Sequence, residues 1–106
     1  MVAAKKGVAV VHVEAGLRSF DRTMPEEINR VVTDHIADLL FVTEPSGVEN
    51  LLREGRSEEA IRLVGNTMID SLDRHIEAAR NAAPWKRLGL HEREYVLVTL
   101  HRPANV

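Results

Sequence analysis

Apolar and polar positions follow one another along the chain in blocks that predict strands and helices in turn. The first block, Val8–Val13, is apolar except at His12, a pattern typical of a parallel strand covered by helices on both faces. Similar short blocks predict strands at Leu39–Thr43, Ile61–Val64 and Tyr95–Leu100. We therefore expect a parallel sheet in which Val8–Val13 is a central strand.

Helices are predicted between these strands. Proline in a first turn, followed by two glutamates, favours a helix beginning at Pro25. Apolar residues then recur at helical spacing and predict one apolar face: Ile28, Val31, Val32, Ile36 and Leu39. Pro45 and Gly55 predict the start and the end of a short helix, and Met68 lies near the start of a longer one. Ala3–Gly7, with two lysines and a glycine, is typical of a helix end.

The regular succession of strand and helix predicts an α/β protein with a Rossmann-like, doubly wound parallel sheet. Residues 81–94 are polar and are interrupted by Pro84 and Gly89, which is typical of a connector. Little helix precedes the first strand, and no helix follows the last one to cover it. We therefore expect the chain to be a piece of a longer protein.

Composition narrows the classes of function. The chain has 106 residues, of which 14 are Lys or Arg and 16 are Asp or Glu, giving a formal net charge of -2. No large basic field is available for nucleic acid or an anionic membrane, so we expect neither as a partner. The absence of cysteine excludes disulfides and thiolate metal sites. Because no apolar run approaches about 20 residues and no secretory signal opens the chain, we expect a cytoplasmic protein.

The ionisable groups at strand ends are the first candidates for chemistry. Ligands of open parallel sheets bind outside the carboxyl ends of the strands, and Glu14 and His101 follow the first and the last predicted strand. A carboxylate in that position is suited to proton transfer. The simpler alternative is that Glu14 forms an ion pair with Arg18 in the loop.

The start of the helix at Pro25 carries a second group of candidates. Glu26 and Glu27 have an ordinary explanation, because acids at a helix N-terminus contribute up to about 1 kcal/mol. Glu26 and Arg30 can also form a surface pair worth about 0.3–0.5 kcal/mol. The same helix end attracts phosphate, with Arg18 and Arg30 as cationic partners.

Other chemistries are less well supported. His12 is most simply a strand residue with a hydrogen-bond partner, and His35, His75 and His91 are expected on helix surfaces or in the connector. No pair of histidines has zinc-ligand spacing beside a carboxylate, so we predict no metal site. No glycine-rich dinucleotide or nucleoside-triphosphate motif is present.

Several segments together resemble one family, the non-hydrolysing UDP-N-acetylglucosamine 2-epimerases. The central one is HVEAGLRSFDRTMPEEINR, residues 12–30, which is followed by Asp34-His35. The others are FVTEPSGVENLLREG, VGNTMIDSL and LVTLHRPANV, at residues 41–55, 64–72 and 97–106. The resemblance covers essentially the whole chain, in order and with spacing similar to that of the family.

The resemblance implies part of a two-domain fold of the GT-B glycosyltransferase type, with the active site between two Rossmann-like domains. Residues 1–72 would form the second half of the first domain. Residues 73–94 would be the interdomain helix and connector, and residues 95–106 the first strand of the second domain. A homodimer is expected for the full-length enzyme, because the family tends to dimerise.

The resemblance also implies a reaction, the interconversion of UDP-N-acetylglucosamine and UDP-N-acetylmannosamine in cell-surface polysaccharide synthesis. UDP leaves first, a carboxylate removes the proton from carbon 2, and UDP adds back while a proton arrives on the opposite face. Glu14 and Glu26 resemble the family's acid/base carboxylates, and His101 and Arg102 resemble groups at the diphosphate. Arg18 and Arg30, together with Arg102, are candidates for substrate binding, although the first two are equally suited to orienting the carboxylates. No redox cofactor is needed, because no hydride moves.

Two departures from the family pattern qualify these expectations. Ala104 stands where family members usually have glutamate. The family's GTRPE segment, its GDT segment and its late serine- and glycine-rich segment are absent, so we expect no epimerase activity from this chain alone. Two alternatives remain open: a hydrolysing relative that releases UDP and free N-acetylmannosamine, and a non-catalytic nucleotide-sugar sensor.

Overall fold

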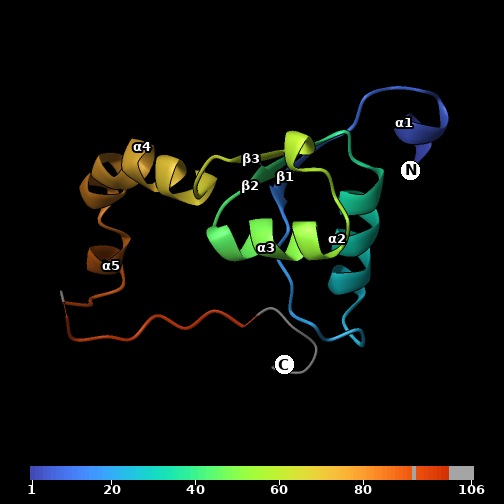
Figure 1. Cartoon of the computed structure of the whole chain (residues 1–106). Coiled ribbons are helices and arrows are strands. Elements are labelled where there is room, and N and C mark those ends of the chain that lie inside the picture. The colour runs from blue at the N-terminus through green and yellow to red at the C-terminus, as the bar shows by residue number, and fades with distance from the viewer. Residues whose placement is uncertain (92, 101–106) are drawn as a thin grey trace. The chain divides into compact units, whose positions relative to one another are not determined.

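A computed structural model gives the fold of the chain and describes residues 1–91 and 93–100 (Figure 1). The chain divides into two compact units, Met1–Ser71 and Leu72–Val106. The first unit contains the sheet and its helices. The second contains most of helix α4 (Thr67–Ala82) and the short helix α5 (Pro84–Arg87).

The sheet has three parallel strands: β1 (Val11–Ala15), β2 (Leu39–Val42) and β3 (Ile61–Leu63). They pair in the order β1-β2-β3, and Val11 lies opposite Leu39 at the start of the first pair. The parallel sheet and the positions of β2 and β3 confirm the prediction from the sequence. Strand β1 begins three residues later than the predicted Val8–Val13 and extends to Ala15, so Glu14 lies within the strand and does not follow it. All three carboxyl ends lie at one edge of the sheet, because the strands are parallel.

Two helices connect the strands (Figure 1). Helix α2 (Pro25–Ile36) joins β1 to β2, and helix α3 (Pro45–Arg53) joins β2 to the turn of 3₁₀ helix η1 (Glu58–Ala60) that precedes β3. Each α-helix has proline in its first turn, as the sequence predicts. The predicted helix end at the N-terminus is also present, as α1 (Val2–Lys5) followed by Gly7 at φ +68°.

A small core lies between β2 and the helices. Its buried apolar side chains come from all three strands, from α3 and from the end of α2: Ala15, Ala37, Leu40, Val42, Leu51 and Ile61. Arg56 ties the turn after α3 to the end of α2, because its guanidinium donates to the carbonyl of His35 at 3.2 Å and to that of Ala37 at 2.5 Å. A cation is favourable there, where the helix dipole is negative.

The prediction that the first strand is central is wrong for the described part of the chain. Strand β1 pairs only with β2 and lies at an edge of the sheet. Val11 and Val13 remain 51% and 49% exposed. The apolar pattern correctly indicated a strand, but the predicted cover on both faces is not observed, since only Ala15 of β1 is buried.

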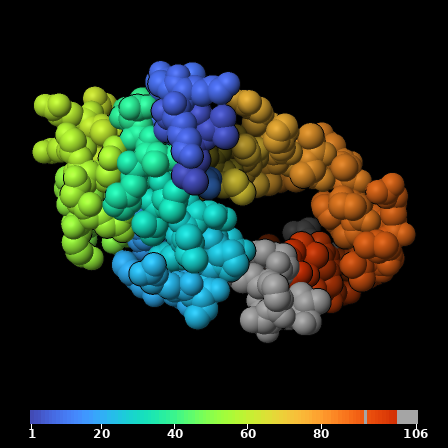
Figure 2. Space-filling model, turned by 90° about the vertical axis from the view of Figure 1, so that its right-hand side faces the viewer, coloured from blue at the N-terminus to red at the C-terminus, as the bar shows by residue number. Residues whose placement is uncertain are grey.

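The predicted apolar face of α2 also differs from the observed orientation. Ile28 and Val32 are 48% and 39% exposed, whereas Glu27 and Asp34 are buried. Figure 2 shows the outer surface of this helix, in cyan to green, open below the blue N-terminal residues. The buried side of α2 is therefore partly charged, because polar groups beneath it bind these two carboxylates.

The strand predicted at Tyr95–Leu100 does not form. The described residues 95–100 have no regular secondary structure, and Val96 and Leu97 are 86% and 82% exposed. A strand needs a neighbouring strand for its backbone hydrogen bonds. Within the described ranges no strand pairs with this segment. Its apolar sequence alone was therefore not sufficient to form a strand.

Two glycines allow the loop after β1 to touch the first turn of α3. Gly16 has φ +80°, and a Cβ atom on it would lie 2.4 Å from the carbonyl oxygen of Gly47. A Cβ atom on Gly47 would in turn lie 2.7 Å from Cγ1 of Val42. Because the obstacle at Gly16 is backbone, no rotamer change can remove it.

Replacing Gly16 by alanine is therefore expected to destabilise the fold more than an ordinary glycine substitution. Gly55→Ala is the matched control, because Gly55 has φ +83° with nothing within 4 Å of the added carbon. We expect a loss of about 1 kcal/mol for the control and of more than about 2 kcal/mol for Gly16→Ala, measured by urea unfolding. Equal losses would show that the contact with Gly47 is unimportant.

Candidate functional site

Glu14 lies where the pairing of β1 with β2 is interrupted. Val13 pairs with Phe41 and Ala15 pairs with Val42, so Glu14 is the extra residue of a β-bulge. Its φ is +65°, in the left-handed region that residues other than glycine rarely adopt. The bulge interrupts the alternation of side chains at the carboxyl end of the strand and leaves Glu14 exposed.

A residue far along the sequence approaches this carboxylate. The hydroxyl of Thr67, at the start of α4, donates to Oε1 of Glu14 over 3.4 Å, which is a long hydrogen bond. Glu26 is exposed in the first turn of α2, and α2 follows the loop that leaves the carboxyl end of β1. In a strand–helix–strand unit with parallel strands, that helix end faces the same edge of the sheet, so Glu14 and Glu26 share one end of the domain.

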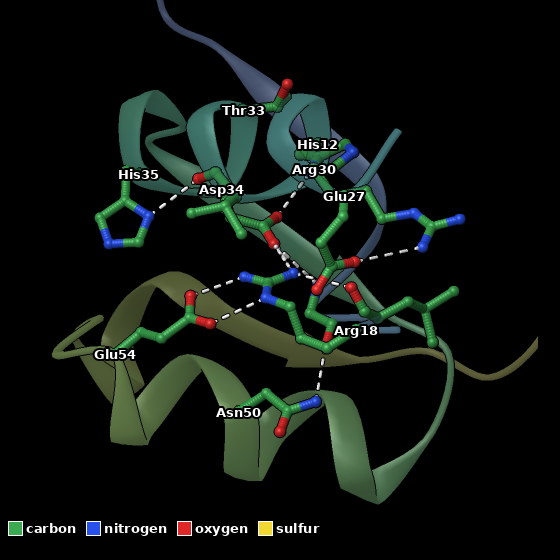
Figure 3. Close-up of polar contacts among 12 residues, drawn as sticks. His12, Arg18, Glu27, Arg30, Thr33, Asp34, His35, Asn50 and Glu54 are labelled. Atoms are coloured by element: carbon green, nitrogen blue, oxygen red, sulfur yellow. Dashed lines mark hydrogen bonds and ion pairs between the residues drawn. The ribbon is translucent and has the colours of Figure 1, made fainter. Parts of the chain in front are cut away.

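Beneath this edge lies a buried ionic network, shown in Figure 3. The side chain of Arg18 is only 1% exposed and binds Glu54 through two parallel bonds, from Nε to Oε1 at 2.7 Å and from Nη2 to Oε2 at 2.6 Å. Its Nη1 atom lies 2.7 Å from Oδ2 of Asp34. The bond to Glu54 is the main cause that raises the pKa of Arg18, so the guanidinium stays charged despite its burial.

Asp34 is the most enclosed member of the network, with 0% of its surface exposed. Its Oδ1 atom lies 2.6 Å from Nδ1 of His12, and its Oδ2 atom accepts the backbone N–H of Gly16 at 3.1 Å. Together with the pair to Arg18, these contacts satisfy both carboxylate oxygens. The predicted role of His12 as a strand residue with a hydrogen-bond partner is confirmed.

Glu27 organises the loop that precedes α2. It accepts the backbone N–H of Ser19 at 2.9 Å, the hydroxyl of Ser19 at 3.0 Å and the backbone N–H of Phe20 at 3.0 Å. The bond from the Ser19 N–H is the main cause that holds the pKa of Glu27 below its ordinary value, in opposition to burial. The predicted capping role is not observed, because the N-cap of α2 has no side-chain hydrogen bond. Glu27 binds the loop that precedes the helix instead.

The two arginines of the site form ion pairs with other acids than the sequence predicted. Arg18 pairs with Asp34 and Glu54 and not with Glu14, so the simple explanation of Glu14 as a partner of Arg18 is wrong. Arg30 pairs with Glu27, with 3.5 Å between Nη1 and Oε2, in place of the expected pair with Glu26. The guanidinium of Arg18 is enclosed, which favours its orienting role over substrate contact.

Arg30 remains 34% exposed in its side chain and can still reach a ligand. His101 and Arg102 lie outside the described residues, as does Ala104. Of the predicted site residues, the structure thus describes the two glutamates and two of the three arginines.

Sequence reasoning missed the roles of Asp34, Glu54 and Asn50. Asn50 donates to the carbonyl of Gly16 at 3.0 Å and so holds the same loop. One signal was available: Glu27 and Asp34 are seven residues apart and must share a face of α2. No local signal marks Glu54, because its partner Arg18 is 36 residues away.

Neither a metal cluster nor a membrane helix is found in the described ranges. No group of three or more potential metal-ligating side chains comes together in residues 1–91 and 93–100. Over the same residues, no helix has both the length and the apolar character needed to span a bilayer.

Comparison with known proteins gives a consistent family relationship. The family profile described as UDP-N-acetylglucosamine 2-epimerase matches residues 1–106. The UDP-N-acetylglucosamine 2-epimerase of Methanocaldococcus jannaschii is 48% identical over 109 residues, covering 100% of this chain and 30% of the relative. The Pseudomonas aeruginosa UDP-2,3-diacetamido-2,3-dideoxy-D-glucuronate 2-epimerase is 41% identical, covering 99% of this chain and 29% of the relative. The chain thus spans about 30% of the length of these curated relatives.

Solved structures show the same relationship. The M. jannaschii enzyme in complex with UDP-GlcNAc and UDP has a TM-score of 0.77 at 49% identity, over 82% of this chain and 24% of that one. The Rickettsia bellii UDP-N-acetylglucosamine 2-epimerase has a TM-score of 0.80 at 34% identity, over 85% of this chain and 24% of that one. These likenesses confirm the predicted α/β fold class, that of enzymes of the GT-B type.

The contacts of Glu27 predict a specific pH dependence of stability. Because its pKa is lower in the folded chain than the ordinary value of about 4.3, it stabilises the fold above that pH, and this contribution is lost as the pH falls through the lower folded value. Glu27→Gln should therefore flatten the decline of the unfolding free energy in acid, as measured by urea unfolding from pH 7 downwards. Parallel curves for the two proteins would contradict this role.

Proposed function

Because the chain belongs to the UDP-N-acetylglucosamine 2-epimerase family, we propose that it supplies the first-domain side of a nucleotide-sugar epimerase active site. The reaction we propose is the interconversion of UDP-N-acetylglucosamine and UDP-N-acetylmannosamine by elimination and re-addition of UDP. The observation that carries the proposal is the pair of exposed carboxylates, Glu14 and Glu26, at the carboxyl end of the parallel sheet.

The reaction requires acid/base groups on two faces of the sugar ring. Departure of UDP gives carbon 1 positive character, which acidifies the proton on carbon 2 so that a carboxylate can remove it. The pair of electrons left by that proton forms the double bond of a 2-acetamidoglucal. UDP then adds to carbon 1, and carbon 2 takes a proton on the opposite face. Two carboxylates from different elements, Glu14 on the bulge of β1 and Glu26 on α2, suit this division.

Cations are needed where the diphosphate leaves. We propose that His101 and Arg102 bind it, as their motif implies, and that Arg30 adds positive charge beside Glu26. Arg18 is assigned a different role, because its guanidinium is enclosed by Asp34 and Glu54. We propose that it orients the loop that follows Glu14 and does not bind the substrate.

The proposal extends to the rest of the protein. A chain that matches 30% of its relatives carries part of a site that we place between two domains, with the boundaries predicted from the sequence. Residues 1–72 then belong to the first domain, residues 73–94 to the connector and residues 95–106 to the second domain. We expect the complete enzyme to form a homodimer.

The 106-residue chain by itself should show no turnover of UDP-N-acetylglucosamine, because groups from a second domain are needed to hold the leaving diphosphate. The measurement is chromatographic separation of UDP-N-acetylmannosamine, free N-acetylmannosamine and UDP after prolonged incubation. Formation of either acetylmannosamine product by the purified chain would overturn the proposed division of the site.

A chimaera provides a test of the residues. In it, this chain replaces the matching segment of the M. jannaschii relative, about 30% of that protein. We expect Glu14→Gln and Glu26→Gln each to lower kcat by about 10²–10⁴-fold, which is the usual contribution of a general acid or base. Glu49→Gln is the control, because Glu49 is an exposed acid of α3 without a proposed role.

The products distinguish the alternatives. UDP-N-acetylmannosamine supports the epimerase, free N-acetylmannosamine with UDP indicates the hydrolysing reaction, and binding without turnover indicates a sensor. UDP-2,3-diacetamido-2,3-dideoxy-D-glucuronate is tested in parallel, because a relative 41% identical is named for that sugar. An unchanged kcat in both glutamine variants would refute the assigned acid/base roles.

A further inference from the structure

We propose that Asp34 is a positioning residue that fixes the orientation of Glu14, a role that rests on the function proposed above for Glu14. Asp34 does not lie at the exposed edge of the sheet. It is enclosed beneath the loop after β1, with no exposed surface, and acts through its contacts with that loop.

The contacts of Asp34 reach the chain on both sides of Glu14. His12 lies two residues before Glu14, and its Nδ1 atom is 2.6 Å from Asp34. Gly16 lies two residues after Glu14, and its backbone N–H donates to Asp34 at 3.1 Å. Arg18 follows two residues later, with 2.7 Å between its Nη1 atom and the same carboxylate. One side chain on α2 thus contacts β1 before the bulge and the chain after it at two points; Figure 3 shows Asp34 with His12 and Arg18.

Glu14 needs such support for two reasons. Its φ of +65° is unfavourable for a residue with a side chain, so the conformation persists only where its surroundings impose it. Its carboxylate is exposed, and the bond from Thr67 at 3.4 Å is too long to orient it firmly. The direction of this side chain is therefore set mainly by the backbone of the bulge.

An alternative role for Asp34 is to neutralise the charge of Arg18, but this role explains fewer of its contacts. Glu54 already binds that guanidinium through two short, parallel bonds. A carboxylate needed only for charge balance would have no reason to bind His12 and the backbone of Gly16 as well. These two contacts flank Glu14 in the sequence, which points to the conformation of the bulge as the property that Asp34 controls.

The first test uses the 106-residue chain and NMR of residue 14. The chemical shifts of its Cα and Cβ atoms and its φ-dependent coupling report whether Glu14 stays in the left-handed region. We expect this signature to be lost in Asp34→Asn, while residues of β3 and α3 keep their shifts. Asp38→Asn is the matched control, because Asp38 accepts the N–H of Val10 at 2.8 Å, just before the opposite end of β1.

If Asp34→Asn does not fold, two variants of His12 test whether Asp34 fixes the conformation of Glu14. His12 has a side chain that is 21% exposed, so its replacement is milder. His12→Asn can donate to Asp34 from nearly the same position and should keep the signature of Glu14, whereas His12→Ala should lose it. A left-handed Glu14 in folded Asp34→Asn, or in His12→Ala if the first variant is unfolded, overturns the proposal.

The second test measures turnover in the chimaera. Misplacing a catalytic group by about 1 Å costs on the order of 10²-fold, so Asp34→Asn should lower kcat by about that factor. KM should change little, because Asp34 does not touch the substrate, and Asp38→Asn should leave both constants unchanged. A folded Asp34→Asn chimaera with normal kcat but a displaced Glu14 would leave the positioning role intact and refute the catalytic role of Glu14.

Discussion

The organisation of this domain depends on the burial of one guanidinium, that of Arg18. A buried cation requires anionic partners, and here they come from two distant elements, Asp34 on α2 and Glu54 just after α3. Removing one partner of such a pair typically costs roughly 3–5 kcal/mol, because it leaves an uncompensated charge. The loop after β1, helix α2 and the end of α3 are therefore held in one arrangement, although few apolar side chains pack between them.

The same constraint separates two kinds of acid in this chain. Glu27, Asp34 and Glu54 are occupied by backbone N–H groups, a hydroxyl or cations, and they determine the shape of the loop. Glu14 and Glu26 are exposed at the carboxyl end of the sheet. The first three acids stabilise the fold through their bonds within the protein. The two exposed glutamates have carboxylates that a ligand can reach. Neighbouring glutamates, Glu26 and Glu27, belong to different kinds because successive helix positions point in different directions.

The close contact of Gly16 with Gly47 extends the effect of the network to α3. The loop after β1 is held from one side by Asp34 and from the other by Asn50, which binds the carbonyl of Gly16. Glycine at both contact positions lets the two backbones approach where side chains would collide. The bulge at Glu14 lies at the end of β1, directly before this loop, and Ala15 beside it is fully buried.

The sequence alone determined the class of fold, the presence of three strands, and the starts of β2, β3, α2 and α3, because apolar runs and proline act locally. It placed the first strand three residues too early. Family motifs within the chain also identified Glu14 and Glu26 as the acids to consider. Only the tertiary structure decided that β1 lies at an edge, that α2 turns charged residues inward and that residues 95–100 form no strand. Pairing with another strand and burial against another element are properties of the whole fold. The partnership of Arg18 with Glu54 joins positions 36 residues apart, and no local pattern encodes it.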